Sequence, residues 1–177
     1  EVADHAAALT LSLVRRVVSR HAQVLAGRWH IGQAEPIHRV ADHVLGLVGF
    51  GKIARAYLHR MKAFGISRVL VHDPHVDAAT LATHGAEAVD LETLCRRAHI
   101  VSLHAPATPA TRHLINARTL GWMGPRTCLI NTSRGALVDD AALADALKAG
   151  RLFGAALDVQ EVEPMAADAP LRDAPHL

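Results

Sequence analysis

The chain carries a glycine-rich turn whose spacing suits contact with phosphate groups. Gly49 and Gly51, followed by Ala54, interrupt an apolar run that resumes with helical periodicity. Gly49 allows a tight turn, Gly51 lets backbone N–H groups approach a pyrophosphate, and the small Ala54 lets a helix pack close to its strand. This spacing, directly after the apolar segment 44–48, predicts a strand, a phosphate-binding turn and a helix that together bind a dinucleotide.

Asp73 ends the next apolar segment, 68–72, about 20 residues beyond the glycines. An acidic residue there can accept hydrogen bonds from the ribose hydroxyls of an adenosine. Its charge would repel a 2′-phosphate, so we expect NAD to be preferred over NADP. The alternative is a glycine turn and a helix-capping Asp in an α/β protein that binds no nucleotide. Agreement among strand, helix and Asp disfavours that interpretation.

Polar residues also follow the later apolar segments. His104 comes after segment 100–103, Thr132 and Arg134 come after segment 127–131, and Asp158 with an acidic cluster closes the last one. Each has a simpler interpretation, since Arg134 could be a solvated loop cation and Asp158 a turn cap. Because ligands bind beyond the carboxyl ends of strands in open parallel sheets, their shared position predicts one site.

The elements that position these residues alternate regularly along the chain. Helical patterns begin near residues 53, 77, 90, 116 and 141, and the predicted strands are 44–48, 68–72, 86–89, 100–103, 127–131 and 152–159. Such a βαβ series with right-handed crossovers predicts an α/β, Rossmann-type fold. We expect a doubly wound parallel sheet of six strands in the order 3-2-1-4-5-6, with helices on both faces and a further N-terminal helix.

Composition narrows the classes of function. Half of the 177 residues are apolar, with a net charge of +2 and no long basic run, which argues against a nucleic-acid partner. No apolar stretch approaches the roughly 18 residues of a membrane span. Cys95 and Cys128 predict reduced thiols and a cytoplasmic location. His72 and His75 lack further ligands at tetrahedral spacing, so we expect no metal.

Five segments together resemble the NAD-binding domain of the D-isomer-specific 2-hydroxyacid dehydrogenases. They are VGFGKIA, VHDP, VSLHAPATPATRHLI, LINTSRGALVD and GAALDVQEVEP, and the resemblance covers essentially all of residues 1–177. INTSRG followed by LDV and EP is more specific than the glycine turn, because it fixes loops after two further strands. The family includes phosphoglycerate, glyoxylate and D-lactate enzymes, formate dehydrogenase and the C-terminal-binding-protein co-repressors.

The resemblance implies a role for each matching residue. It places the pyrophosphate at the glycine turn, the adenosine ribose at Asp73, and the nicotinamide end at the loops after the last two strands. His104 matches a loop histidine, for which we expect a structural role. The residues expected to bind the cofactor are Gly49, Phe50, Gly51, Lys52, Ile53, Asp73, Ala105, Pro106, Thr111, Thr132, Ser133, Arg134 and Asp158.

Arg134 and Glu163 match the catalytic residues of the family that this sequence contains. Reduction of a 2-keto acid requires a hydride donor, a cation for the carboxylate and an acid for the new alkoxide. The planar guanidinium of Arg134 can grip a carboxylate with two hydrogen bonds. Glu163 would keep a histidine protonated, because a carboxylate beside an imidazole raises its pKa.

The resemblance also implies that residues 1–177 form one NAD-binding domain of a longer protein. Pro175–Leu177 aligns just before the Thr-Pro-His motif that carries the family's histidine acid, so His176 does not match it. We expect that histidine after residue 177 and a substrate domain before residue 1. Residues 1–177 alone should therefore bind NAD but turn over substrate poorly or not at all.

The N-terminal segment 2–27 predicts one helix that is apolar on two adjacent stripes, which is wider than one sheet covers. The resemblance to the family favours a homodimer through this helix, and a helix buried within a complete monomer is the alternative. For the whole protein we weigh an NAD-dependent dehydrogenase for a small 2-hydroxy or 2-keto acid against an NAD-sensing dimeric scaffold like the co-repressors. Arg134 and Glu163 favour the enzyme, and an excised domain that binds NAD without turnover is a third possibility.

Overall fold

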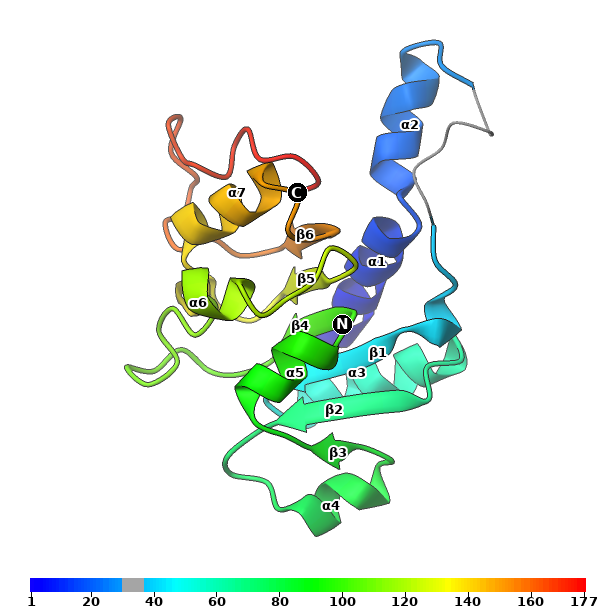
Figure 1. Cartoon of the computed structure of the whole chain (residues 1–177), viewed down its shortest axis with the longest axis vertical. Helices are drawn as coiled ribbons and strands as arrows, with labels where there is room; N and C mark the ends of the chain where they lie inside the picture. Colours follow the sequence, from blue (N-terminus) through cyan, green and yellow to red (C-terminus); the bar gives the residue numbers. More distant parts are fainter. Residues whose placement is uncertain (30–36) are drawn as a thin grey trace.

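A six-stranded, entirely parallel sheet runs through the centre of the molecule (Figure 1). The computed structural model describes residues 1–29 and 37–177. The strand order is β3-β2-β1-β4-β5-β6, which confirms the predicted order and fold class. The strands are β1 (Val44–Val48), β2 (Arg68–His72), β3 (Glu87–Ala88), β4 (Ile100–Leu103), β5 (Cys128–Asn131) and β6 (Gly154–Leu157).

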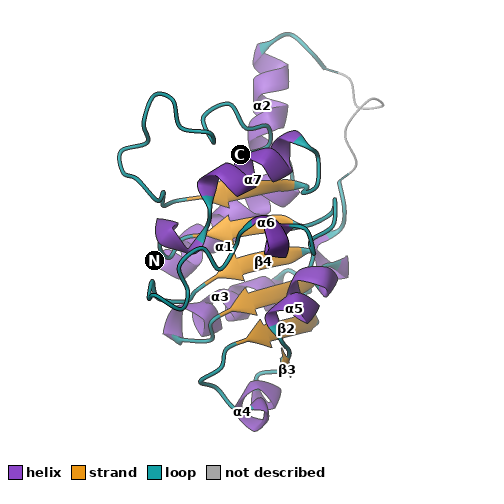
Figure 2. Cartoon of the chain, turned by 60° about the vertical axis from the view of Figure 1, so that its left-hand side comes forward, coloured by secondary structure: helices purple, strands orange, loops and turns teal. Residues whose placement is uncertain are grey.

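Helices cover both faces of the sheet (Figure 2). One face carries α5, α6 and α7, and the other carries α1 and α3. The helices are α1 (Val2–Val14), α2 (Val17–Leu25), α3 (Lys52–Ala63), α4 (Ala78–Thr83), α5 (Leu91–Arg97), α6 (Ala117–Leu120) and α7 (Asp140–Lys148), with 3-10 turns at Val40–Asp42 and Gly135–Leu137. None of the described helices is long and apolar enough to cross a membrane.

Both faces of the sheet are packed, which explains why its strands are apolar almost throughout. All five residues of β1 are buried. Val44 and Val48 pack into the core on the α5 side, whereas Leu45 and Leu47 pack into the core on the α1 and α3 side. Strands of a parallel sheet with covered faces have this continuous apolar character, so the sequence pattern and the packing agree.

The N-terminal segment forms two helices, so the prediction of one continuous helix was wrong. The chain breaks at Arg16, whose φ of 56° is left-handed. The Arg16 guanidinium lies 3.7 Å from the centroid of the Phe153 ring, and its Nη1 lies 2.9 Å from Nδ1 of His176. These contacts with Phe153 and His176 hold Arg16 at the break between the two helices. As a result α1 packs on the sheet, while α2 projects from the body with no buried residue (Figure 1).

Both ends of α7 have residue types that commonly stop a helix. Asp139 caps α7 by accepting a hydrogen bond from the Ala142 N–H at 3.0 Å, and Gly150 follows that helix with a φ of 63°. The edge strands β3 and β6 are shorter than the predicted segments 86–89 and 152–159. The tail 166–177 contains no helix or strand.

Candidate cofactor and substrate site

The glycine turn packs directly against the loop that follows β4. Gly49 has a φ of 88°, and a Cβ there would lie 2.9 Å from backbone atoms of His104 and Ala105. A side chain at this position would therefore be strained and would collide with backbone. A Cβ on Gly51 would meet nothing within 4 Å, so the space beside that residue is open. Helix α3 begins at Lys52 without a side-chain cap, which leaves its first N–H groups facing this opening.

Asp73 ties the end of β2 to the glycine turn. Its Oδ2 accepts a hydrogen bond from the Phe50 N–H at 2.7 Å, and its Oδ1 accepts one from the His75 N–H at 2.9 Å. Each carboxylate oxygen retains a lone pair for a further donor such as a hydroxyl. The Phe50 side chain is buried, so this residue can contribute to a ligand site mainly through its backbone.

Most of the predicted cofactor residues line two adjoining cavities at the carboxyl ends of the strands. A cavity of about 360 Å³ is lined by the glycine turn, Asp73, Ala105, Pro106 and Thr111. A second cavity of about 480 Å³ shares His104, Ala105 and Pro106 with the first, and adds Ile53, Thr132, Ser133 and Arg134. The two cavities therefore adjoin at the loop after β4, one toward the end of β2 and the other toward the end of β5.

Arg134 and Glu163 both line a third cavity, of about 460 Å³, which shares Ser133 and Arg134 with the second. Asn131 fixes the loop that follows it in the sequence. Its Nδ2 donates to the Arg134 carbonyl at 2.9 Å, and its Oδ1 accepts from the Ser133 N–H at 3.1 Å. Glu163 Oε1 accepts a hydrogen bond from the Gln160 N–H at 2.9 Å. The structure therefore brings a guanidinium and a carboxylate to one hollow beside the cofactor cavities.

Thr132 has a buried hydroxyl without a hydrogen-bond partner among the described residues. Buried polar atoms are almost always satisfied, and an unsatisfied one costs about 1–3 kcal/mol. Because Thr132 lines the second cavity, a ligand there can supply the missing partner. The open space at Gly51 and this hydroxyl are the two features that fit a bound dinucleotide.

Two predicted residues lie outside these cavities. Lys52 is exposed at the first position of α3. Asp158 contacts His5 of α1, with 3.2 Å between Nε2 and Oδ1, and both side chains are about half exposed. Such an exposed pair contributes little to stability and exchanges readily for another partner.

Sequence reasoning missed several residues at the site. Pro74, His75 and Leu114 line the first cavity, and Val2 lines the second. Pro74 and His75 directly follow Asp73, so proximity in sequence could have indicated them. Nothing in the sequence around Val2 indicates its position, because α1 reaches the site only through its packing on the sheet.

His104 is neutral and packed between the cavities and the core. Its Nε2 lies 2.9 Å from Ser102 Oγ, and its ring centroid lies 5.3 Å from that of Tyr57. Burial lowers the pKa of His104 to about 4. Among the described residues, no group of three His, Cys, Asp or Glu side chains could hold a metal ion.

The depressed pKa of His104 predicts that acid destabilises the fold. Its ordinary pKa is 6.5, so below that pH the unfolded chain binds a proton that the folded chain resists. Stability should be fully present above pH 6.5 and decrease toward pH 4. We expect this residue to account for about 2 kcal/mol of unfolding free energy lost between pH 7 and pH 5, measured by urea denaturation.

His104→Gln should remove part of that loss, whereas the exposed His59→Gln should not change it. Burial also lowers the pKa values of His43 and His99, so the His104 variant retains some acid sensitivity. Identical pH profiles for His104→Gln and the unsubstituted chain would contradict the assignment.

A doubly wound parallel sheet with a glycine turn after β1, a carboxylate after β2 and cavities along its carboxyl edge defines a dinucleotide-binding domain. Residues 7–177 match the family model described as D-isomer specific 2-hydroxyacid dehydrogenase, NAD binding domain. The chain belongs to this family and is an NAD-binding domain.

Individual proteins of known name are also similar to this chain in sequence and in structure. The chain is 46% identical over 150 residues to (S)-sulfolactate dehydrogenase of Chromohalobacter salexigens, covering 84% of this chain and 48% of that protein. It is 41% identical to glyoxylate reductase of Thermococcus litoralis, covering 92% of this chain and 50% of that protein. It also resembles the structure of D-lactate dehydrogenase from Aquifex aeolicus complexed with NAD and lactic acid. There the TM-score is 0.84 at 32% identity, over 90% of this chain and 47% of that chain. The chain spans about half the length of these relatives.

Proposed function

We propose that this domain belongs to an oxidoreductase that transfers a hydride between NAD(H) and a small D-2-hydroxy acid or 2-keto acid. The observation that carries the proposal is the shared cavity of Arg134 and Glu163, which adjoins the second of the two cavities lined by the predicted cofactor residues. The names of the relatives, a dehydrogenase, a reductase and a D-lactate enzyme, favour the enzyme over a co-repressor-like scaffold.

We assign a different part of the dinucleotide to each group of predicted cofactor residues. We assign the pyrophosphate to the N–H groups at Gly49–Gly51 and to Lys52 and Ile53, and the adenosine ribose to Asp73. Ala105, Pro106 and Thr111 border the adenine side. We assign the nicotinamide end to Thr132 and Ser133. The carboxamide of the nicotinamide is assigned to Asp158, whose side chain would leave His5 and bind this group instead. When bound, NADH supplies the hydride.

The chain's own residues would hold the substrate and support proton transfer. Arg134 would bind the substrate carboxylate with two hydrogen bonds and polarise the adjacent carbonyl. Glu163 would stabilise the protonated form of a histidine acid, because its negative charge favours the imidazolium. In the described part of the chain no histidine contacts Glu163, whose carboxylate meets the Gln160 N–H.

Calorimetric titration with NADH and NADPH, followed by a panel of 2-keto acids on the full-length gene product, tests this function. We expect NADH to bind more tightly than NADPH and at least one short 2-keto acid to be reduced. Failure of well-folded protein to bind either nucleotide at millimolar concentration would overturn the proposal.

Asp73→Ala should relax the discrimination against NADPH. We expect the ratio of the two dissociation constants to fall by about tenfold, since one repulsive charge beside the 2′-phosphate is removed. Asp73→Asn is the matched variant, because it removes the charge but keeps an oxygen that can accept from the Phe50 N–H. An unchanged cofactor preference in both variants would remove Asp73 from this role.

We also propose a homodimer formed through the N-terminal helices. Its support is α2, whose Val18 is 70% exposed and whose Leu25 is 75% exposed. A groove of about 330 Å³ lies between α1, α2 and β6 and could receive apolar side chains of a second copy. Light scattering at a protein concentration of roughly tens of micromolar should detect a dimer. Val18→Asp should convert this dimer to a monomer. A monomer throughout that range would count against the proposal.

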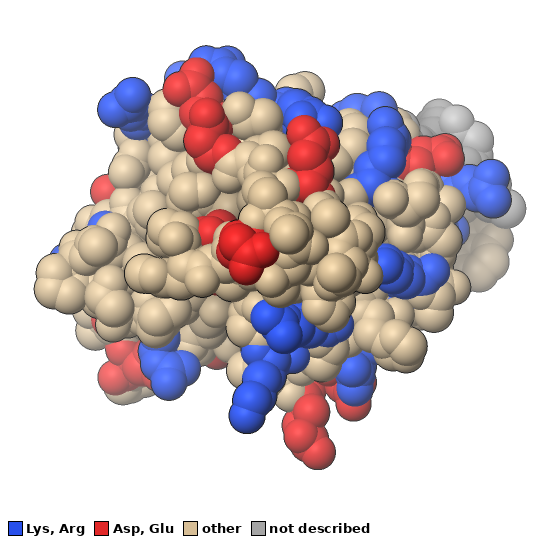
Figure 3. Space-filling model, turned by 90° about the horizontal axis from the view of Figure 1, so that it is seen from below, with Lys and Arg blue, Asp and Glu red and all other residues tan. Residues whose placement is uncertain are grey.

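The cytoplasm is the proposed location, and neither nucleic acid nor membrane is a proposed partner. Cys95 and Cys128 are buried, free thiols whose pKa values burial raises to about 12, as expected of unreactive cysteines in a reducing compartment. On the face seen in Figure 3, Lys and Arg lie in separate groups with Asp and Glu between them. That distribution lacks the continuous basic stripe of a nucleic-acid-binding surface.

A further inference from the structure

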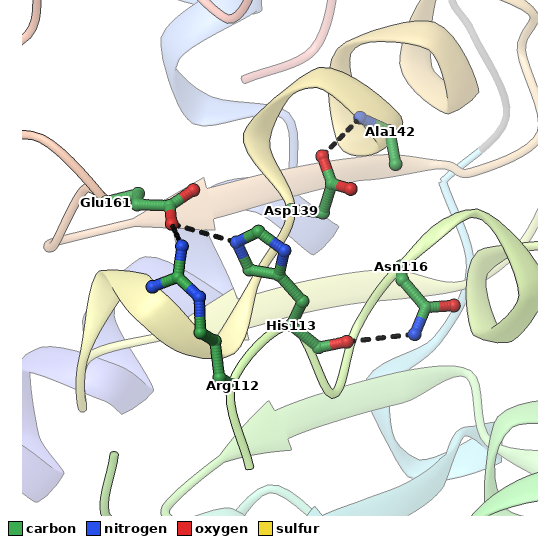
Figure 4. Close-up of polar contacts among 6 residues, drawn as sticks. All are labelled: Arg112, His113, Asn116, Asp139, Ala142 and Glu161. Carbon is green, nitrogen blue, oxygen red and sulfur yellow. Dashed lines mark hydrogen bonds and ion pairs between the residues drawn. The ribbon is translucent and has the colours of Figure 1, made fainter. Parts of the chain in front are cut away.

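A polar cluster at the Arg134 cavity, which Glu161 lines, has no part in the chemistry described so far. Arg112 Nη2 lies 2.5 Å from Glu161 Oε1, and His113 Nε2 lies 2.9 Å from the same oxygen (Figure 4). Arg112 and His113 belong to the segment between β4 and α6, whereas Glu161 belongs to the segment after β6. We call these three residues the Glu161 clasp.

The backbone at His113 is tied to the turn that follows Arg134. The His113 N–H donates to the Ala136 carbonyl at 2.8 Å, and the Ile115 N–H donates to the Leu137 carbonyl at 2.9 Å. The His113 carbonyl accepts a hydrogen bond from Asn116 Nδ2 at 2.9 Å (Figure 4). His113 therefore presents its imidazole from a backbone that is anchored to the loop of Arg134.

The loop of Glu161 rests on the same turn from the other side. A Cβ on Gly135 would lie 1.8 Å from the Gln160 carbonyl oxygen and 2.5 Å from the Glu161 nitrogen, so the two backbones touch. Glu163 follows Glu161 by two residues and is bound to the Gln160 N–H. Whatever holds Glu161 therefore sets the position of Glu163 relative to Arg134.

The burial of Glu161 separates this cluster from ordinary surface ion pairs. Its side chain is 23% exposed, and one oxygen receives both a guanidinium and an imidazole. Charges removed partly from water interact more strongly than exposed ones. Segment 158–164 has no helix or strand, and Val162–Pro164 are exposed. The Glu161 contacts therefore add to the few bonds that hold its path, such as that from the Asp158 N–H to the Asn131 carbonyl at 2.9 Å.

We propose that Arg112, His113 and Glu161 are positioning residues that fix the Glu163 loop against the Arg134 loop. Glu161 borders the cavity of Arg134 and Glu163, but in this assignment its carboxylate binds Arg112 and His113 and not the substrate, so the three residues act through the spacing of Arg134 and Glu163. This proposal rests on the proposed function, because the spacing matters only if the two residues act on one substrate.

The test is Glu161→Ala in the full-length protein, with NADH and a 2-keto acid that the unsubstituted protein reduces. We expect kcat to fall by about 10- to 100-fold, because small misplacements of catalytic groups have effects of that size. The dissociation constant of NADH should stay within about twofold, since none of the three clasp residues lines the two cavities assigned to the cofactor. Glu161→Gln keeps an acceptor at the same position and should recover most of the lost kcat.

Glu87→Ala is the matched control. It removes a carboxylate that is bound by Arg97 at 2.8 Å on the exposed surface, away from the three cavities. We expect its kcat and the hydrogen exchange of segment 158–164 to be unchanged. In Glu161→Ala, amides of segment 158–164 should exchange faster while those of β1 and α3 do not, and this readout needs no enzymatic activity.

The failures of the two proposals are distinguishable. Equal kcat in Glu161→Ala and Glu87→Ala, or unaltered exchange of segment 158–164 in Glu161→Ala, would overturn the clasp. Parallel losses of NADH binding and of unfolding free energy in Glu161→Ala would also overturn it, in favour of a purely structural role. An unsubstituted protein that binds NADH but reduces no 2-keto acid would overturn the proposed function, and with it the catalytic consequence of the clasp.

Discussion

Arg134→Ala in the full-length protein is expected to lower kcat/KM for 2-keto acid reduction by at least about 100-fold. The guanidinium is the exposed cation at the cavity that it shares with Glu163, and its Nη1 currently donates to the Ser133 carbonyl at 2.6 Å. Removing a preorganised donor to a developing negative charge typically costs about 100- to 1000-fold. Steady-state kinetics with saturating NADH measure the loss.

The affinity for NADH should change little in Arg134→Ala, because the residues assigned to the pyrophosphate and ribose lie at other strand ends. Arg134→Lys keeps the charge but lacks the planar fork, so we expect an intermediate rate. Arg96→Ala, on the exposed surface of α5 and paired with Glu92, serves as the control. Equal losses of NADH affinity and of kcat/KM in Arg134→Ala would contradict the assignment of this residue to the substrate carboxylate.

Gly49→Ala is expected to weaken NADH binding by at least about 100-fold and to destabilise the fold by about 1–3 kcal/mol. The new methyl group would lie 2.9 Å from the backbone of His104 and Ala105 in a left-handed conformation that disfavours any side chain. The turn and the loop after β4 would separate, which opens the first two cavities. Calorimetric titration and urea denaturation of the same sample measure both effects.

Gly51→Ala tests NADH binding at the glycine turn without straining the backbone. Its Cβ meets nothing within 4 Å, so the fold should keep its stability. The methyl group would nevertheless occupy the open space that we assign to the pyrophosphate, and NADH affinity should fall by about tenfold or more. Gly124→Ala, where a Cβ also meets nothing, is the control. Full NADH affinity in Gly51→Ala would remove the phosphate assignment from this turn.

The strand order and the glycine turn were predictable from the sequence because both depend on local patterns. An apolar run such as 44–48 must be buried on both faces, and alternation of such runs with helices permits few parallel topologies. The position of Asp73 followed from the same spacing. Its hydrogen bond with the Phe50 N–H was not predictable, because spacing places a carboxylate near a turn without specifying which backbone donor it meets.

Taken alone, the amino-acid sequence determined the fold class, the family and the strand ends at which the candidate residues gather. Those properties depend on periodicity and on residue types at fixed spacing, which act over a few turns of chain. Tertiary structure decided where the N-terminal helix breaks and how the Glu163 loop is held. Arg16 meets Phe153, and Arg112 meets Glu161, across separations of more than 40 residues. Contacts between such distant residues arise only once the sheet has brought their loops together, so no local pattern encodes them.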